Sequence, residues 1–336
     1  MDGVIYHGNR LLPGVKEFVD WLYKEEKEFL FLTNSSERSP KELQQKLARM
    51  GLDVDESHFY TSALATAKFL ASQSPKCSVY VIGAPGLVNA LYDAGITMND
   101  TNPDYVVVGE TRAYNYDMIL KAVSLLQKGA RLVATNSDLT GPTETGIIPA
   151  CRALVAPIEL ATGKQAYFVG KPNPLMMRTG LRMLGVHSDE AAMIGDRMDT
   201  DIVAGMESGL TTVLVLSGVT DLENMQVFAY RPRYILNGVG DMNLGDVKDH
   251  SIDAFGDAYE YLMTMYASNA GKSGGEFFTP ADVSELLTRL GTVGKTEINK
   301  VYDPACGSGS LLLKAESILG KDAIRNGFYG QEINIT

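Results

Sequence analysis

The stretch Ala192-Met-Ile-Gly-Asp-Arg-Met-Asp-Thr-Asp201 runs from three apolar residues through a glycine into a loop that carries three aspartates. A short apolar strand that ends in Gly and Asp is typical of α/β proteins, which place their functional groups at the carboxyl ends of parallel strands. The polar segment Gly170-Lys-Pro-Asn-Pro174 likewise follows an apolar run. Both segments predict that the chemistry collects at strand ends.

Short apolar runs alternate with amphipathic, helix-like stretches from Val15 to about Ile235. The runs that we expect to be buried strands are Phe29–Leu32, Ser78–Ile82, Tyr105–Val108, Leu132–Ala134, Ala192–Ile194 and Thr212–Leu216. Strands that alternate with helices are the pattern of a parallel sheet covered by helices. The sequence therefore predicts the α/β fold class for this part of the chain.

The composition indicates a globular protein with more than one domain. A length of 336 residues suits two or three domains, and the 45% hydrophobic and 21% charged residues are close to the averages for folded proteins. A net charge of −11 argues against coating of nucleic acid by charge alone, but a local basic groove stays compatible with it. No apolar run is long enough to span a membrane and no signal segment begins at Met1, so we expect a cytoplasmic location.

The chain changes character after a last expected strand near Tyr234–Leu236. Residues 237–246 are rich in Gly, Asn and Asp, which predicts a connection, and we place a linker at 242–256. Beyond it, helical patterns cover Phe255–Ala267, Pro280–Leu290 and Ser310–Leu319, and strand patterns cover Lys300–Tyr302 and Gly327–Gln331. A second domain is therefore expected over 257–336.

Four polar groups in the first part match the needs of phosphoryl transfer. They are Asp2, the pair Thr33-Asn34, Lys171 and Asp196. Carboxylates hold Mg²⁺, while a lysine and a hydroxyl neutralise and hydrogen-bond phosphoryl oxygens. Each group alone has a simpler explanation, because an Asp after a strand often caps the next helix and Thr-Asn is a common turn.

Taken together and in this order, the four groups resemble the haloacid-dehalogenase superfamily, in its NagD-like, p-nitrophenyl-phosphatase-like branch. The resemblance covers about 1–241. It implies a Rossmann-like parallel-sheet core from 1–60 and 165–241, with an α/β cap domain inserted over 61–164. The cap would include the loops 134–138 and 141–146, which resemble family loops that face the active site.

The resemblance also implies roles and a Mg²⁺ cofactor. Asp2-Gly3-Val4 resembles the second half of the family's Asp-x-Asp-Gly signature, so Asp2 would be the general acid/base. Thr33, with Asn34 beside it, would bind the phosphoryl group of a small phosphorylated metabolite, and Lys171 would steady it. The implied metal site holds Asp2, Asp196 and Asp201, with Asp201 supporting the site from the same loop.

The sequence departs from the family at the nucleophile. The nucleophilic aspartate of the family lies two positions before the acid/base, which here precedes Met1. Asp2 cannot serve as nucleophile and acid/base together, so the aspartyl-phosphate would lack a carrier. We therefore expect negligible phosphatase activity from the chain as numbered, and a core sheet that lacks part of its middle.

A second group of residues predicts a nucleoside site near the end of the chain. Lys300-Val-Tyr-Asp-Pro-Ala-Cys-Gly-Ser-Gly-Ser310 reads as a strand that runs into a glycine-rich turn before a helix, where a ligand can approach the backbone. The next expected strand ends near Glu332, and an acid at that place commonly holds ribose hydroxyls. A Gly-x-Gly turn alone would be a weak signal, but this longer motif is more specific.

Residues from about Asp257 to Thr336 resemble the modification subunit of type I restriction-modification systems, an adenine-N6 DNA methyltransferase with a partial Rossmann-like fold. The resemblance implies S-adenosylmethionine as cofactor, and DNA with restriction and specificity subunits as partners. The implied cofactor-binding residues are Gly275, Glu276, Phe277, Phe278, Thr279, Pro280, Asp303, Gly307, Ser308, Gly309, Ser310 and Glu332. The family's catalytic Asn-Pro-Pro-Phe-like motif would lie beyond Thr336, so methyl transfer is not expected.

Three interpretations of function follow. The first is a Mg²⁺-dependent phosphatase that carries a foreign C-terminal segment, and it accounts for about two thirds of the chain. The second is a piece of a DNA methyltransferase behind a foreign N-terminal domain. The third is a non-enzymatic fusion that only binds ligands.

Overall fold

The structure is a computed structural model. It describes residues 1–143, 146–242, 281–295, 297–304, 306, 312, 315, 318–319 and 323–331. The chain divides into two compact units, Met1–Leu244 and Gly245–Thr336. The division falls inside the segment 242–256 that the sequence marks as a connection.

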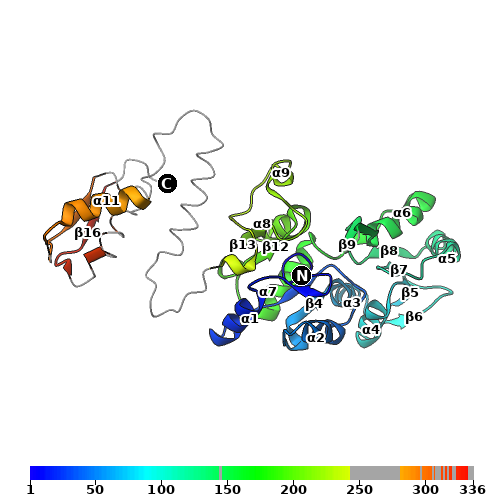
Figure 1. The fold of residues 1–336 in the computed structure, drawn as a ribbon. Coiled ribbons are helices and arrows are strands. Elements are labelled where there is room, and N and C mark those ends of the chain that lie inside the picture. The colour runs from blue at the N-terminus through cyan, green and yellow to red at the C-terminus, as the bar shows by residue number, and fades with distance from the viewer. Residues whose placement is uncertain are drawn as a thin grey trace. The chain divides into compact units, whose positions relative to one another are not determined.

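The first unit contains a core and a cap (Figure 1). Its core elements before the cap are β1 (Tyr6–His7), β2 (Arg10–Leu11), α1 (Val15–Lys24), β3 (Phe31–Thr33), α2 (Pro40–Arg49) and β4 (Phe59–Thr61). Its core elements after the cap are α7 (Pro174–Leu184), β12 (Ala192–Gly195), α8 (Val203–Glu207), β13 (Thr211–Val215), α9 (Leu222–Met225) and β14 (Tyr234–Leu236).

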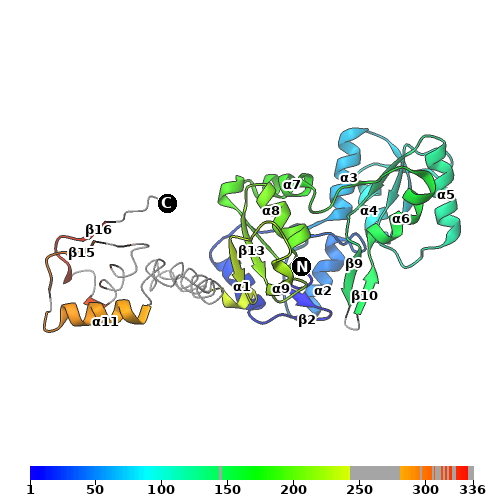
Figure 2. The same ribbon diagram turned by 90° about the horizontal axis from the view of Figure 1, so that it is seen from above.

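The cap lies between these two groups in the sequence. Its elements are α3 (Ser62–Gln73), β5 (Ser78–Ile82), α4 (Pro85–Asp93), β6 (Thr97–Met98), β7 (Tyr105–Val108), α5 (Tyr116–Gln127), β8 (Arg131–Ala134), β9 (Thr140–Thr143), β10 (Gly146–Pro149), α6 (Cys151–Thr162) and β11 (Tyr167–Phe168). Five of the strands form one sheet in the order β11-β8-β7-β5-β6, with every neighbouring pair parallel. Strands β9 and β10 form a separate antiparallel hairpin that projects from the cap (Figure 2).

Helices cover both faces of the cap sheet because its central strands are apolar throughout. Val107 of β7 packs in one cluster with Leu87 and Leu91 of α4. Its neighbours Val106 and Val108 point the opposite way, into a cluster with α5 and α6. Alternate residues of a strand face opposite sides, so an unbroken run of valines produces a strand that is buried on both.

The core strands form two separate sheets. Strand β3 pairs with β4 in one, and β12, β13 and β14 form the other, with all pairs parallel. Helices α1 and α2 pack on the β3–β4 sheet, where Phe31 and Phe59 lie in one cluster with Val15 and Leu47.

Most of the expected strands agree with the structure to within one or two residues, and the α/β class is confirmed. One expected domain boundary is wrong in detail. The sequence analysis assigned everything after 164 to the core, whereas β11 pairs with β8 in the cap sheet. The apolar pair Tyr167–Phe168 continues the cap, and the return to the core follows it. In the part of the chain that the structure describes, Cys77, Cys151 and Cys306 are free thiols, and no helix is both long and apolar enough to cross a membrane.

The second unit shows three regular elements in its described residues. These are α11 (Ala281–Thr292), β15 (Val301–Asp303) and β16 (Phe328–Gly330). Strands β15 and β16 are parallel, with Asp303 opposite Gly330. The expected helix Phe255–Ala267 and most of the expected helix Ser310–Leu319 lie outside the described residues.

Candidate active site

The four polar groups from distant parts of the sequence line one cavity in the first unit. Asp2, Thr33, Asn34, Lys171 and Asp196 all border a space of about 780 Å³ between the core and the cap. Thr33 ends β3, and Asp196 directly follows β12. Because these strands are parallel to their neighbours, their carboxyl ends meet on the same side of the core. The structure thus brings these candidate residues together.

Two glycines leave room for the Asp196 carboxylate, and a backbone amide binds it. Its Oδ2 accepts a hydrogen bond from the Val219 amide at 2.9 Å. A β-carbon on Gly218 would lie 2.1 Å from this oxygen, and one on Gly3 would lie 2.5 Å from it. Gly3 also has φ +77°, which favours glycine. Burial, and then the neighbouring carboxylate of Asp201, raise the pKa of Asp196.

Lys171 and Asp201 form a buried ion pair beside it. The Lys171 Nζ donates to Asp201 Oδ1 at 2.6 Å, and both residues are about 5% exposed or less. Asp201 Oδ2 accepts from the amides of Asp196 and Arg197, each at 3.2 Å. Burial by itself would raise the pKa of Asp201. The Lys171 ammonium, the Met1 amine and these hydrogen bonds outweigh it and hold the pKa below its ordinary value.

The Asp201 carboxylate reaches those amides because the loop turns tightly. A β-carbon on Gly195 would lie 2.2 Å from the β-carbon of Asp201, so only glycine fits there. Residues Met198–Ile202 form one turn of π-helix, a distortion that is common at functional sites. The loop from Asp196 to Asp201 is therefore compact and is stabilised by hydrogen bonds between its own residues.

Asn34 connects the core loop to Lys171 and to the cap. Its Oδ1 accepts from the Lys171 amide at 2.8 Å, and its Nδ2 donates to the Lys171 carbonyl at 3.0 Å. The same Nδ2 donates to Asp138 Oδ2 at 3.2 Å, across the boundary between core and cap. Thr33 Oγ1, which also faces the cavity, accepts from the Ser35 amide at 3.2 Å. The Asn34 side chain thus connects its own loop after β3 with the Lys171 segment and with the cap.

Asp2 also lines the cavity. Its Oδ1 is buried and has no hydrogen-bond partner in the described residues. The His7 Nδ1 is 3.5 Å from it, too far for a good hydrogen bond. The Met1 amine is buried nearby, where burial and then Lys171 lower its pKa. A buried carboxylate oxygen without a partner is suited to bind a cation or a proton.

The cavity offers few side chains that could bind a divalent metal. Among the described residues, no cluster of three or more His, Cys, Asp or Glu side chains is arranged to hold one. Mg²⁺ in phosphate-handling proteins commonly uses one or two carboxylates plus water and phosphate oxygens, and Asp2 with Asp196 offers two. Asp201, expected as a third ligand, has both oxygens engaged by protein donors. This arrangement favours its expected supporting role over direct ligation.

Sequence reasoning did not single out three residues that shape the site. Asp138 lay within a quoted loop, but its bond to Asn34 was not foreseen. Glu110 accepts from Ser36 and Asn136 and borders the same cavity, and burial raises its pKa. Its position two residues after β7 was a strand-end signal that could have found it. Gly218 lies three residues after β13, so the same strand-end signal could have found it.

The second unit contributes little described geometry to its expected site. Asp303 ends β15, and its carbonyl accepts from the Gln331 amide at 2.9 Å. The other expected cofactor-binding residues lie outside the described residues: Gly275, Glu276, Phe277, Phe278, Thr279, Pro280, Gly307, Ser308, Gly309, Ser310 and Glu332.

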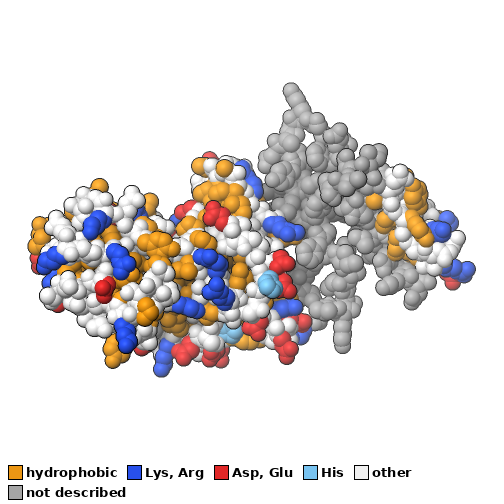
Figure 3. All heavy atoms as spheres, turned by 180° about the vertical axis from the view of Figure 1, so that it is seen from behind, with side chains coloured by type: hydrophobic (Ala, Val, Ile, Leu, Met, Phe, Trp, Pro, Cys, Tyr) orange, Lys and Arg blue, Asp and Glu red, His pale blue; other side chains and the backbone are white. Residues whose placement is uncertain are grey.

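The surface gives the site its electrostatic setting. On the face shown in Figure 3, basic, acidic and apolar side chains are interspersed over the first unit. The cavity itself has Arg38, Lys46, Arg112 and Arg197 on its walls, together with Lys171. The same walls carry six acidic side chains, so charges of both signs line the cavity: Asp2, Glu37, Glu110, Asp138, Asp196 and Asp201.

A parallel-sheet core with an inserted cap, and carboxylates, a lysine and a hydroxyl at its strand ends, defines a hydrolase class. Residues 1–97 match the family model of haloacid dehalogenase-like hydrolases, and residues 168–242 match a HAD-hydrolase-like model. The chain belongs to the haloacid dehalogenase-like hydrolases. Residues 250–336 match the N-6 DNA methylase family model, which supports the expected second part.

Within this family the first unit is similar to NagD-type phosphatases. The chain is 44% identical over 257 residues to dihydroxyacetone phosphatase of Corynebacterium glutamicum (strain R), covering 76% of this chain and 92% of that protein. It is 43% identical over 244 residues to ribonucleotide monophosphatase NagD of Escherichia coli (strain K12), covering 73% and 96%. The solved structure of NagD from the K-12 strain matches with a TM-score of 0.69 at 42% identity, over 73% of this chain and 96% of that one.

The contacts of Gly218 give a first prediction. Gly218→Ala is expected to lower the free energy of unfolding by about 1–3 kcal/mol, because its β-carbon would collide with the fixed Asp196 carboxylate. Urea unfolding followed by circular dichroism measures it. Gly180→Ala in α7 is the matched control, since its nearest contact would be an ordinary 3.6 Å. Equal stability of wild type and Gly218→Ala would contradict the packing described.

The lowered pKa of Asp201 gives a second prediction. A depressed carboxyl pKa stabilises the fold above the pKa of the unfolded chain, and this stabilisation is lost as the pH falls through the folded value. The stability difference between wild type and Asp201→Asn is therefore large near pH 6 and shrinks below about pH 4. Urea titrations from pH 6 to pH 3 measure it. Asp199→Asn, which removes a more exposed partner of Arg197, is the control. A difference that does not change with pH would argue against the pair.

Proposed function

We propose that the first unit is a Mg²⁺-dependent phosphatase of small phosphorylated metabolites in the cytoplasm, acting through an aspartyl-phosphate. The observation that carries the proposal is that Asp2, Thr33, Lys171 and Asp196 line one cavity between core and cap. The relatives' names, dihydroxyacetone phosphatase and ribonucleotide monophosphatase, support this reaction class. They differ in substrate, and we assign none of their substrates here.

The residues divide the work by their chemistry. Lys171 Nζ, held by Asp201 at 2.6 Å, presents a fixed positive charge to a phosphoryl group at the end of β3. The Thr33 hydroxyl and the Asn34 amide next to it are the hydrogen-bonding groups at that strand end. Asp2, with its unpartnered Oδ1, is placed to hold a proton for the leaving group or to give it up.

Asp2 and Asp196 are the residues that would hold Mg²⁺. Bound there, the ion would neutralise charge on the phosphoryl oxygens. Gly3 and Gly218 leave the space that the Asp196 carboxylate occupies, and the Val219 amide orients it by a hydrogen bond before any ligand arrives. Preorganised charge of this kind avoids reorganisation during the reaction.

The nucleophile is the part of the proposal that the numbered residues do not supply. An aspartate directly before Met1, at the end of an apolar strand, would place a carboxylate two positions before Asp2. We expect the 336-residue chain to hydrolyse p-nitrophenyl phosphate far more slowly than a form extended in this way. Ordinary turnover by the 336-residue chain would contradict the assignment of the nucleophile.

The extended form gives a third prediction. In it, Asp196→Asn is expected to abolish Mg²⁺-dependent hydrolysis of p-nitrophenyl phosphate, because one of two proposed metal ligands is lost. Asp2→Asn should lower kcat by about 10²–10⁴, the usual contribution of a general acid/base. Asp199→Asn on the same loop is the control and should retain activity. Steady-state rates across a Mg²⁺ titration measure all three, and an active Asp196→Asn variant would refute the metal assignment.

A second candidate function belongs to the second unit. We propose that residues 250–336 retain weak S-adenosylmethionine binding, which the match to the N-6 DNA methylase model favours. Asp303 at the end of β15, beside the parallel β16, supports a nucleoside site there. DNA and restriction or specificity subunits would be partners of this segment, with methyl transfer itself not expected.

Calorimetry gives a fourth prediction. Titration of S-adenosylmethionine into the full chain should show weak binding, with a Kd on the order of 1 mM, or about −4 kcal/mol. Asp303→Ala should remove the heat. Glu297→Gln, which alters an exposed pair with Arg325 in the same unit, should leave it unchanged. Absence of heat with the unaltered chain would count against this second function.

A further inference from the structure

One wall of the cavity between core and cap carries two cations that the proposed function does not use. Arg38 lies two residues before α2 and Lys46 lies on that helix, and both line the cavity. Burial, and then the charge of Arg38, lower the pKa of Lys46, so the two side chains lie near one another. We call these two side chains the basic pair.

The ring of Tyr6 positions Lys46 at this wall. The Lys46 Nζ lies 3.8 Å from the centroid of the ring, and Tyr6 itself is only 7% exposed. An ammonium group is attracted to the face of an aromatic ring. This contact orients the ammonium but does not neutralise its charge, so the charge stays available to a ligand.

The backbone around Arg38 is held between the core and the cap. The Glu37 carbonyl accepts a hydrogen bond from the Gly86 amide at the start of α4, at 3.2 Å. A β-carbon on Gly86 would lie 2.7 Å from the Arg38 carbonyl carbon, so the close approach requires glycine. Directly after Arg38, Ser39 caps α2 through reciprocal hydrogen bonds with Glu42. The exposed Arg38 side chain therefore extends from a backbone that is fixed on both sides.

Neither member of the basic pair forms an ion pair in the described part of the chain. Glu42 lies on the same helix as Lys46, but its carboxylate accepts from the Ser39 amide and hydroxyl, at 2.8 and 2.9 Å. Asp2 and Glu37 line the same cavity without pairing with either cation. Two neighbouring positive charges repel each other, so an anion that contacts both would relieve this repulsion.

The basic pair lies on the side of the cavity where the leaving group is expected. Asp2, the proposed donor of a proton to the leaving group, forms a β-bridge with Tyr6, whose ring Lys46 contacts. The charge of Asp2 also raises the pKa of Lys46, against the larger effects of burial and Arg38. A substituent on the leaving group can therefore extend from Asp2 toward the basic pair.

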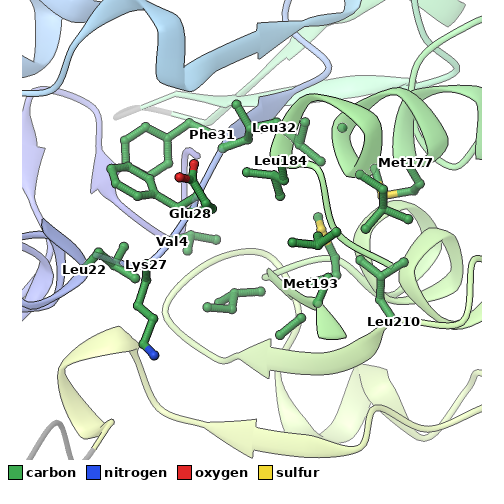
Figure 4. A pocket seen from close by; sticks show the side chains of 18 of the residues that line it. Val4, Leu22, Lys27, Glu28, Phe31, Leu32, Met177, Leu184, Met193 and Leu210 are labelled. Atoms are coloured by element: carbon green, nitrogen blue, oxygen red, sulfur yellow. The ribbon is translucent and has the colours of Figure 1, made fainter. Parts of the chain in front are cut away.

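A second cavity, of about 520 Å³ in the core, suits an anion less well. Its lining is largely apolar, as Leu32, Met177 and Met193 show (Figure 4). Lys27 lines it next to Glu28, so a cation there has an acid beside it. An anionic group therefore has better partners in the cavity at the cap.

We propose that Arg38 and Lys46 form a subsite for a second anionic group, a carboxylate or a second phosphate, on the leaving group of the phosphorylated substrate. The inference rests on the proposed phosphatase function, because it places the transferred phosphoryl group at Thr33 and Lys171. The guanidinium fork of Arg38 matches both anions, and the Lys46 ammonium binds either one as a point charge. The basic pair thus selects small metabolites that carry an anionic group besides the transferred phosphate.

The fifth prediction compares ligands that differ by one anionic group. Calorimetric titrations of the 336-residue protein with Mg²⁺ compare glycerol 3-phosphate with 3-phosphoglycerate, in which a carboxylate replaces the CH2OH group. They also compare fructose 6-phosphate with fructose 1,6-bisphosphate. The ligand with the second anion should bind about fivefold more tightly in at least one comparison, the size expected of partly exposed charge contacts. The comparison that shows the preference identifies the anion, and equal affinities in both overturn the subsite.

A matched pair of variants on α2 locates the subsite. Lys46→Gln and Lys41→Gln remove the same charge from the same helix, but Lys41 is exposed and does not line the cavity. Lys46→Gln should bring the ratio of the two dissociation constants close to one, whereas Lys41→Gln should keep the wild-type ratio. Lys46→Arg keeps a cation over Tyr6 and should retain most of the preference. Equal effects of Lys46→Gln and Lys41→Gln refute the subsite.

Arg38→Gln tests the subsite without altering the contact on the Tyr6 ring. Arg38 precedes the helix and is exposed, and circular dichroism checks that the variant folds. The substitution should lower the ratio of dissociation constants in the same direction as Lys46→Gln. A wild-type ratio in Arg38→Gln contradicts the proposed role of Arg38 in the subsite.

The ligands with a single anionic group separate this inference from the proposed function. Saturable binding of glycerol 3-phosphate or fructose 6-phosphate, with displacement by inorganic phosphate, supports the phosphoryl site independently of the basic pair. If these ligands bind and the second anion adds no affinity, the subsite is rejected and the proposed function stands. If none of the four ligands binds, the proposed phosphoryl site is rejected, and the subsite is rejected with it.

Discussion

The buried ion pair between Lys171 and Asp201 is the interaction on which the site depends. Asp201 uses its second oxygen to bind two amides of its own loop, and Lys171 uses its backbone to bind Asn34. Asn34 then reaches the cap through Asp138. Loss of either member of a buried pair leaves an uncompensated charge, which typically costs 3–5 kcal/mol. The Lys171–Asp201 ion pair thus connects the aspartate-rich loop to Lys171 and, through Asn34, to the cap.

Much of the fold could be predicted because its strands are short, apolar and punctuated by polar ends. Strands β5, β7 and β14 have the bounds that the sequence indicates. The beginning of β3 was placed two residues too early, since Phe29 and Leu30 are apolar for another reason. Phe29 stacks on His58, with the ring centroids 4.0 Å apart. An apolar pattern in the sequence indicates that residues are buried, but it does not indicate that their backbone pairs in a sheet.

The candidate site could be predicted only where a residue follows a strand and has a recognisable neighbour. Asp196 and Lys171 meet this condition, and the structure places both in the cavity. The Asn34–Asp138 contact joins residues 104 positions apart in the sequence, and no local pattern contains it. The ion pair of Asp201 with Lys171 similarly depends on the turn that Gly195 permits. For the second unit, most expected residues lie outside the described part of the chain.

The Asn34–Asp138 contact also has a kinetic consequence. Because it bridges the cap and the core at the wall of the cavity, any movement of the cap away from the core must break it. Lid movements of this type occur on the microsecond to millisecond scale and often limit turnover. Burial raises the pKa of Asp138, so the acceptor that latches the cap can gain a proton under milder acidity than an exposed carboxylate would need. Protonation of Asp138 would then weaken the contact between the cap and the core.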